Sequence, residues 1–553
     1  MQSSEKLSEY DNKMIKNFKK LIQNDTLVLK NRKIVQSLQF VSKLNVKELE
    51  IQYCKNMIPE LTDDSITKLT IYGYGIENID GFKLNNLQVL ELYNISSIKN
   101  IVSYVNLKEA DLSQNTKLDI SPLQQLTKLV SLKLKLCQLK DISLLKNLIC
   151  LETLDLSENE NINIDSLKYL INLNDLKILR CKLQDISPLS KLINLKLLDL
   201  SENQFGSLGS DYLSPLQYLQ NLSDLKLVQC SLQDVSFLSL SLSLVLLNLS
   251  ENRLRNIQPL QNLVNLTTLN LERNLLENIQ GIQQLSRLYE LNLGHNEYVN
   301  ISSLRCLAQL IKLKLCHCQL NNISVLSTLI NLEELDISQN INIVDISPLQ
   351  YLVKLKKLEL AHNSIQNSQA LMNLMNLQEL DCSYNIGFNI TPIQYCIRLL
   401  RLNLSNCQIH SIFELRTLVN LENLSLTDNC ITNIFPLQHQ TKLKILFLHF
   451  NKIFDFSALL NHPNYHLYKV ELQQNSQMAQ THAELKLAYK MQQVDIVNVQ
   501  HQNFSKDFQR TITKLSQTKK RINIYVKQLY MHQLQFTGKV VLHFQSTNFI
   551  DYQ

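Results

Sequence analysis

One short phrase recurs along almost the whole chain and constrains its fold more than any other feature. The phrase reads LxxLxLxx(N/C)xL, and 14 of the 20 intervals between its 21 copies are 22 residues long. In the strong copies the first strand leucine is Leu132, Leu154, Leu176, Leu198, Leu225, Leu247, Leu269, Leu291, Leu313, Leu335, Leu358, Leu380, Leu402, Leu424 or Leu446. Weaker copies begin at Leu27, Leu49, Leu69, Leu90, Ala110 and Val470. A period of this length predicts a stack of similar supersecondary units.

Each copy predicts a short strand followed by a return segment. Side chains alternate along a strand, so the two leucines of LxL point to one side and the residues beside them point away. One unit cannot bury such an apolar face by itself, and stacked units therefore share a core, with their strands parallel. The sequence predicts an α/β solenoid of about 21 repeats over residues 25–475, a horseshoe with a parallel concave β-sheet.

Both ends of a solenoid need a cover for the core. Leu7, Tyr10, Met14, Phe18 and Leu21 follow helical spacing, which predicts a helical cap within residues 1–24. Residues 476–553 are predicted to form a mainly helical tail, with an apolar stripe that includes Ile522 and Val526. The tail has ten Lys and Arg against four Asp and Glu and thus carries the entire net charge of +6.

The repeat unit, written DISPLxxLxxLxxLxLxxN, resembles the leucine-rich repeats of bacterial internalins. It is also similar to the leucine-rich regulatory subunit of protein phosphatase-1. The resemblance covers about residues 25–475 and implies the leucine-rich-repeat fold, whose members bind very different partners. It implies binding of a partner protein as the general function and phosphatase regulation as one specific form of it.

One position of the phrase is restricted to two residue types. Asparagine occupies it at Asn115, Asn159, Asn203, Asn252, Asn274, Asn296, Asn340, Asn363, Asn385, Asn429 and Asn451, and cysteine at Cys54, Cys137, Cys181, Cys230, Cys318 and Cys407. The chain leaves the strand here, and a buried amide or, more weakly, a thiol bonds the backbone of the bend. These cysteines are at least two units apart, beyond the reach of a disulfide. We therefore expect structural thiols and no disulfides.

The residue after the first strand leucine is free to vary. In six consecutive units it is Asp111, Lys133, Asp155, Lys177, Asp199 and Lys226. Neighbouring strands place these side chains in line, so opposite charges alternate. Mutual pairing of the charges is the interpretation that we favour. A partner-binding surface that includes Asp155, Lys177 and Asp199 remains the alternative.

Later in the same row Asp336, Glu359 and Asp381 follow one another. Like charges on adjacent strands repel, so stability does not explain these acids, although Lys312 and Lys357 lie close enough to soften the repulsion. One hypothesis is a surface for a basic or polar partner, and the other is a solvated surface.

Aromatic side chains share these variable positions. His317, His362 and Tyr384 occupy the third variable position, and Tyr72 and Tyr93 share the second variable row near the N-terminus. Exposed aromatic residues are typical of protein interfaces. We include all five in the predicted partner-binding surface of the concave sheet.

The chain offers little material for catalysis. It has only 9 glycines, and no glycine-rich phosphate loop or HExxH pair is found. The one compact group of metal-ligand types, Cys316-His317-Cys318, places its two cysteines in opposed environments, Cys318 inward and Cys316 on the concave surface, which defeats joint ligation. No catalytic, cofactor-binding or metal site is predicted, and the protein is expected not to be an enzyme.

The remaining features concern location and partners. The first residues lack the apolar core of a secretory signal, no apolar run is long enough to span a bilayer, and N-x-[ST] triplets fall within predicted strands. These features predict a cytoplasmic protein without a transmembrane segment. The basic run of the tail lacks interleaved aromatic residues, which disfavours nucleic acid. The sequence predicts a scaffold that binds an unidentified partner protein through its concave face, with phosphatase regulation or nucleic-acid association through the tail as alternatives.

Overall fold

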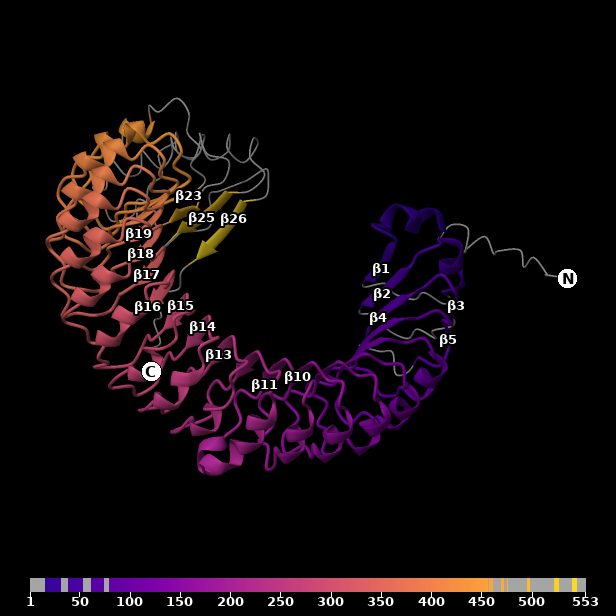
Figure 1. The fold of residues 1–553 in the computed structure, drawn as a ribbon. Coiled ribbons are helices and arrows are strands. Elements are labelled where there is room, and N and C mark those ends of the chain that lie inside the picture. The colour runs from indigo at the N-terminus through magenta and orange to yellow at the C-terminus, as the bar shows by residue number, and fades with distance from the viewer. Residues whose placement is uncertain are drawn as a thin grey trace. The chain divides into compact units, whose positions relative to one another are not determined.

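The computed structural model describes residues 15–30, 38–52, 61–73, 79–455, 457–460, 469–471, 475, 495–497, 522–526 and 540–544. The chain separates into two units, one of Met1–Leu275 and Gln280–Arg287, the other of Leu276–Ile279 and Leu288–Gln553. Both have the same construction, with short strands along one side and short helices along the other (Figure 1).

Within each unit the repeat strands are parallel, and each one pairs in register with the next. Those of the first unit are β1 (Thr26–Lys30), β2 (Glu48–Gln52), β4 (Lys68–Tyr72), β6 (Val89–Tyr93), β7 (Glu109–Asp111), β8 (Ser131–Lys133), β9 (Thr153–Asp155), β10 (Asp175–Lys177), β11 (Leu197–Asp199), β12 (Asp224–Lys226), β13 (Leu246–Asn248) and β14 (Thr268–Asn270). Those of the second are β15 (Glu290–Asn292), β16 (Lys312–Lys314), β17 (Glu334–Asp336), β18 (Lys357–Glu359), β19 (Glu379–Asp381), β20 (Arg401–Asn403), β21 (Asn423–Ser425), β22 (Ile445–Phe447) and β23 (Lys469–Glu471). These 21 strands confirm the predicted number of repeats and the parallel sheet.

The return segments contain 3-10 helices of one to three turns. In the first unit they are η1 (Lys19–Leu21), η2 (Gln39–Lys43), η3 (Lys99–Ser103), η4 (Ser121–Gln125), η5 (Ser143–Asn147), η6 (Asp165–Tyr169), η7 (Ser187–Lys191), η8 (Phe205–Ser207), η9 (Ser210–Tyr218), η10 (Ser236–Leu238), η11 (Gln258–Asn262) and η12 (Gln280–Ile282). In the second they are η13 (Ser302–Cys306), η14 (Ser324–Thr328), η15 (Ser347–Tyr351), η16 (Gln369–Asn373), η17 (Thr391–Tyr395), η18 (Phe413–Thr417) and η19 (Phe435–His439), followed by α2 (Ser457–Leu460). The proline of the ISPL element stands in the first helical turn, as Pro188 does in η7, where its fixed φ fits and no N–H is needed.

The core of each repeat is filled from both sides. In one repeat Leu154 and Leu156 come from the strand and Leu167, Leu170 and Leu173 from the return segment, and all five are fully buried. Burying a leucine contributes roughly 1.5–3 kcal/mol, so the stacked leucines account for the regular spacing of the strands. The predicted two-sided core is confirmed.

The one long repeat keeps its strand register. Leu198 of β11 pairs with Leu225 of β12, so the five extra residues lie in the return segment. They extend η8 and η9, joined at Gly209, whose φ of +90° is open to glycine and strained for other residues. The insertion therefore changes the helix side and leaves the sheet intact.

At the N-terminus residues 15–18 are helical and lead into η1, with Phe18 fully buried. The helix ends at Leu21, and residues 1–14 of the predicted cap lie outside the described residues. Two further short strands, β3 (Leu61–Thr62) and β5 (Phe82–Lys83), form a separate parallel pair.

The described parts of the tail are strands, not helices. They are β24 (Asp495–Val497), β25 (Ile522–Val526) and β26 (Val540–Phe544), which form a parallel three-stranded sheet. Our assignment of Ile522 and Val526 to a helix is therefore wrong, because the segment INIYV is rich in β-branched and aromatic residues, which favour a strand. The other predicted helical positions lie outside the described residues. Within the described ranges, no helix has the length and apolarity to cross a bilayer.

Candidate functional site

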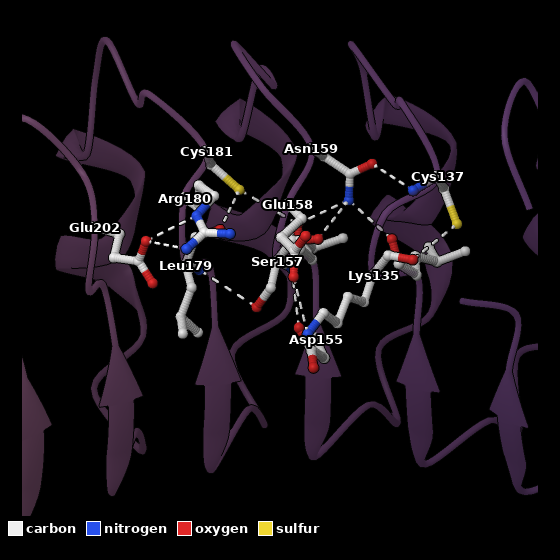
Figure 2. A network of polar contacts seen from close by, with 12 residues as sticks. Lys135, Cys137, Asp155, Ser157, Glu158, Asn159, Leu179, Arg180, Cys181 and Glu202 are labelled. Carbon is white, nitrogen blue, oxygen red and sulfur yellow. Dashed lines mark hydrogen bonds and ion pairs between the residues drawn. The ribbon is translucent and has the colours of Figure 1, made fainter. Parts of the chain in front are cut away.

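A ladder of buried polar side chains follows the ends of the strands (Figure 2). The amide nitrogen of Asn159 donates hydrogen bonds to the carbonyl oxygens of Leu134 and Leu156, at 2.8 Å each. Its Oδ1 accepts from the N–H groups of Cys137 at 3.1 Å and Leu139 at 2.9 Å. One asparagine thus joins its own bend to the preceding repeat. The predicted role of this position is confirmed.

Cysteine takes the same position with fewer bonds. Each of five buried thiols donates to a carbonyl oxygen of the preceding repeat at 3.2–3.4 Å, namely those of Cys137, Cys181, Cys230, Cys318 and Cys407. Burial raises the pKa of Cys181 to about 12, so the thiol stays protonated and unreactive. Cys54 lies outside the described residues.

The residue before each ladder position has a left-handed backbone, with φ between +51° and +65°. We call these residues the turn row, and it contains Gln114, Leu136, Glu158, Arg180, Glu202, Gln229, Glu251, Arg273, His295, His317, Gln339, His362, Tyr384, Asn406, Asp428 and Phe450. The sequence did not reveal this strained conformation, which a non-glycine residue adopts only when its surroundings impose it.

The predicted aromatic residues of the turn row form two separate stacks. The rings of His362 and Tyr384 lie 4.0 Å apart and nearly parallel, and those of His295 and His317 lie 4.8 Å apart. Gln339 occupies the repeat between the two pairs. His362 and Tyr384 are exposed and His317 is half-buried. The four rings of the two stacks thus follow one another along the turn row of the second unit.

We call the residues after the first strand leucines the following row. As predicted, Asp155, Lys177 and Asp199 are aligned across β9, β10 and β11. Within the described part of this six-residue alternation, however, only Lys133 and Asp111 form an ion pair, at 3.4 Å. The favoured interpretation of mutual pairing is therefore wrong for most of the row.

The aspartates of this row bond the backbone instead. Oδ1 of Asp155 accepts from the N–H of Ser157 at 2.9 Å, and Oδ1 of Asp199 accepts from that of Ser201 at 3.1 Å. An Asx turn of this kind stabilises the end of the strand. Aspartate at this position thus has a local structural role that the charge pattern concealed.

Two acids that the sequence analysis missed lie in the row before the strand leucines, which we call the preceding row. Asp175 and Asp224 are half-buried on either side of the repeat that holds Asp199. Burial raises the pKa of both carboxyl groups. Neither carboxylate makes a hydrogen bond or ion pair within the described residues, and Oδ1 of Asp175 is buried. The sequence did contain a sign of these two acids. Three neighbouring repeats have an uncharged residue in the preceding row, namely Ser131, Thr153 and Leu197.

The three acids of the second unit are aligned as predicted, on β17, β18 and β19. Asp336 accepts hydrogen bonds from the N–H of Ser338 at 3.0 Å and its hydroxyl at 2.6 Å. Asp381 bonds Ser383 in the same way, at 2.8 and 2.6 Å. These two aspartates therefore have structural partners, contrary to the view that stability does not explain them.

Glu359 differs from its two neighbours. It forms an ion pair with Lys357 at 3.1 Å, while burial, and then the charges of Asp381 and Asp336, raise its pKa. A cavity of about 250 Å³ opens beside it. The cavity is lined by Lys312, Leu313, Lys314, Glu334, Leu335, Asp336, Ser338, Lys357, Glu359 and Ala361. Three lysines share this wall, so the acids here are partly neutralised.

The preceding row of the second unit has the paired ladder that we expected in the first. Lys312 and Glu334 are 2.9 Å apart, and Glu379 contacts both Lys357, at 3.8 Å, and Arg401. Exposed pairs of this kind each contribute roughly 0.2–1 kcal/mol. Ion pairing along the preceding row thus distinguishes this unit from the first, where Arg180 pairs with Glu202 in the turn row and Lys133 with Asp111 in the following row. We refer to the preceding, following and turn rows together as the sheet face.

The two predicted tyrosines near the N-terminus come together. The rings of Tyr72 and Tyr93 stack with centroids 5.0 Å apart, and the Tyr93 hydroxyl donates to Asp111 at 3.2 Å. Both are half-buried, and burial raises the pKa of Tyr93. This pair is a continuation of the sheet face in the first unit.

The Cys316-His317-Cys318 segment has no convergent ligands. The thiol of Cys318 points into the ladder and donates to Leu293, whereas Cys316 is half-buried beside Gly294, where a Cβ would lie 2.8 Å from its sulfur. Among the described residues no three metal-ligand side chains gather.

The fold matches those of several solved structures. A leucine-rich-repeat protein of Leptospira interrogans is 24% identical, with a TM-score of 0.51 over 66% of this chain and 90% of its own. The chain has the leucine-rich-repeat fold. TLR13, in a complex with ssRNA13, is 20% identical, with a TM-score of 0.58 over 80% of this chain and 81% of its own. An internalin of Listeria monocytogenes is 28% identical, with a TM-score of 0.46 over 61% and 86%. Neither the family models nor the curated proteins contain a match to the sequence.

Proposed function

We propose that this leucine-rich-repeat protein is a scaffold whose sheet face binds a partner protein that presents lysine or arginine side chains. The observation that carries the proposal is the pair Asp175 and Asp224, half-buried carboxylates without an ion pair in the described residues. A carboxylate that has lost water and gained no partner is destabilised, and a partner's cation offsets that cost.

The surroundings of the pair support the same proposal. Asp199 lies between them on β11, so three carboxylates occupy adjacent strands. Lys177 and Lys226 stand in the following row of the same strands, outside ion-pair distance, and their charges offset only part of the effect of burial on the pKa of the two carboxyl groups. A partner with alternating basic and polar side chains fits this pattern, because it meets the acids and avoids the two lysines.

A separate contact surface is proposed for the second unit. There the cavity beside Glu359 and the exposed stack of His362 and Tyr384 occupy neighbouring strands. Aromatic faces supply contact area at low entropic cost, and Glu359 supplies a charge whose lysine partner is exposed enough to exchange. Because the acids here are partly neutralised, this contact adds less affinity than that of the first unit.

The test is quantitative capture from a lysate with three full-length baits. The first is the intact chain, the second carries Asp175→Lys with Asp224→Lys, and the third carries Glu160→Lys with Asp211→Lys. The control acids belong to the same unit, are exposed and lie off the sheet face, so both variants change the charge equally. Partners should fall roughly tenfold or more with the second bait only. Equal recovery with all three baits would remove the proposal.

A second candidate function is association with nucleic acid. The tail carries the net charge of +6, and a structure with the same fold, TLR13, is in a complex with ssRNA13. Binding of this kind weakens steeply with salt, roughly a thousandfold between 50 and 200 mM for six phosphate contacts. Filter binding of single-stranded RNA across that range separates it from the protein partner. Regulation of a phosphatase and a cytoplasmic location are, like nucleic-acid association, further proposals for this protein.

A further inference from the structure

A row of exposed aliphatic side chains lies off the sheet face in the second unit. It comprises Ile330, Val353, Met375, Ile397 and Val419, one from each of five consecutive repeats, and we call it the edge ridge. Their exposed fractions are 53, 48, 59, 54 and 46%. Each stands between two buried leucine-type positions of the return segment, so packing of the core does not require an apolar residue there.

Cations stand directly after two of the ridge residues, Val353 and Ile397, and at the same position of the repeat that follows the ridge. Lys354, Arg398 and Lys442 are exposed, and each is held by the asparagine of the repeat before it. These contacts are Lys354–Asn331 at 2.7 Å, Arg398–Asn376 at 2.6 Å and Lys442–Asn420 at 2.7 Å. None of the three cations forms an ion pair within the described residues. Their charges are therefore fixed in place and uncompensated.

The asparagines themselves are anchored to the repeats. Asn376 donates to the carbonyl oxygen of Val353 at 2.8 Å, and Asn420 donates to that of Ile397 at 3.0 Å. Two residues after Asn420, Glu422 is paired with Lys444 at 2.7 Å. The acids on these turns are thus neutralised, while the cations beside the ridge are not.

Tyrosines precede the ridge in the same repeats. Tyr351 and Tyr395 are the last residues of η15 and η17, two positions before Val353 and Ile397, and are 56 and 44% exposed. The order aromatic, aliphatic, basic therefore occurs twice, in YLVK and YCIR, 44 residues apart.

We propose that the edge ridge docks the protein on a membrane surface that contains anionic lipids. Aliphatic side chains enter the boundary of the acyl region, tyrosines prefer the headgroup level, and lysine and arginine bind lipid phosphates. A lipid surface presents phosphates to every cation beside the ridge. It therefore does not have to match the 44-residue spacing between YLVK and YCIR. The inference is independent of the proposed protein partner, because the ridge shares no residue with the sheet face.

The first unit offers a matched comparison. Ile149, Ile171 and Ile193 occupy the same position and are 56, 52 and 55% exposed. The next residue in each of these repeats is uncharged, namely Cys150, Asn172 or Asn194. Exposed lysines do precede these isoleucines, at Lys146, Lys168 and Lys191, but none stands at the position after them, where asparagines of the second unit hold Lys354 and Arg398. This row therefore lacks the cations that the edge ridge holds in place, and it should select anionic lipid less strongly.

The experiment is co-sedimentation of the full chain with vesicles of phosphatidylcholine alone or mixed equally with phosphatidylserine. The variants are Met375→Asp with Ile397→Asp, Lys354→Glu with Arg398→Glu, and the control Ile171→Asp with Ile193→Asp. All side chains changed are exposed, so the fold should survive, which far-ultraviolet circular dichroism checks. The tail is the same in every chain, so its contribution cancels.

We expect the intact chain and the control to bind the mixed vesicles. The aliphatic variant should lose roughly tenfold or more of the binding, and the charge reversal should lose a similar factor that disappears at high salt. The inference is overturned if the intact chain does not bind, if both ridge variants bind like the intact chain, or if the control falls equally. It is also overturned if light scattering shows the ridge variants to abolish a dimer while vesicle binding is unchanged.

Discussion

The buried ladder and the sheet face of the first unit use similar polar groups in opposite ways. Asn159 is fully buried, and both ends of its amide are bonded to backbone groups of two repeats. Asp175 is half-buried at the start of the next strand, β10, and neither of its oxygens has a partner in the described residues. Polar groups whose hydrogen bonds are made within the chain hold the repeats together. Polar groups without a partner in the chain are available to a binding partner.

The sheet face of the second unit falls between these two cases. Asp336 and Asp381 are bonded to serines, and Glu359 is paired with Lys357. Adjacent acids in one row are therefore not a sufficient sign of a binding surface. What matters is whether the neighbouring rows already satisfy them.

The largest effect is expected inside the ladder. Asn159→Leu removes the hydrogen bonds of five buried backbone groups and should lower the free energy of unfolding by about 3 kcal/mol. Asn194→Leu is the matched control, since its exposed amide makes one bond, to Ile171 at 3.0 Å, and should cost about 0.5 kcal/mol. Urea denaturation measures both. Equal losses would show that the ladder is not the main polar support.

A thiol in the ladder should matter less than an amide. Cys181→Ala removes two weak bonds, to Leu156 and Leu179, and some packing, and should cost about 1 kcal/mol. Cys150→Ala, at an exposed site, should change stability by less than about 0.5 kcal/mol. A Cys181→Ala loss as large as that of Asn159→Leu would contradict the ranking.

The same thiol should also resist alkylation. Because its pKa is raised to about 12, Cys181 should react with iodoacetamide only after unfolding, whereas exposed Cys150 and Cys306 should react in the folded chain. Peptide mass spectrometry reads each site. Labelling of Cys181 in the native chain at the rate of Cys150 would refute a buried ladder position.

The smallest expected effect has the opposite sign. Burial raises the pKa of Asp175 and Asp224, so folding disfavours their charged forms, and each costs stability once the pH rises through the ordinary carboxyl range. Asp175→Asn with Asp224→Asn should therefore raise Tm at pH 7 by roughly 1–3 °C, and the gain should vanish near pH 3. Asp141→Asn should bring no gain, because this carboxylate is exposed and an asparagine there still accepts from the N–H of Ser143, as Asn163 accepts from that of Asp165. Thermal melts of both variants and the intact chain at pH 7 and pH 3 measure these differences in Tm. A double variant with no gain at pH 7 would contradict the expected cost of the two half-buried charges.

The sequence predicted the repeat strands, the parallel sheet and the ladder because burial of leucine dictates a period that can be read directly. It did not predict the partners of surface charges. Asp175 stood in a row without a pattern, and the pairing of Glu379 with Arg401 depends on which rotamers meet across strands. The stack of His362 on Tyr384 depends on the left-handed backbone of the turn row. That conformation could not be predicted, because residues of many types adopt it in this row. In the tail, helical spacing misled because INIYV alternates β-branched residues.

The most direct test of the account compares the two sheet faces in one binding experiment. A captured partner is titrated against the full chain carrying Asp175→Asn with Asp224→Asn, and against the chain carrying Asp336→Asn with Asp381→Asn. The first change removes unpaired carboxylates and should weaken binding roughly tenfold or more, while the second removes charges already engaged with serines and should stay within about twofold. A tenfold loss in the second variant, with the first unchanged, would contradict the claim that unsatisfied carboxylates mark the binding face.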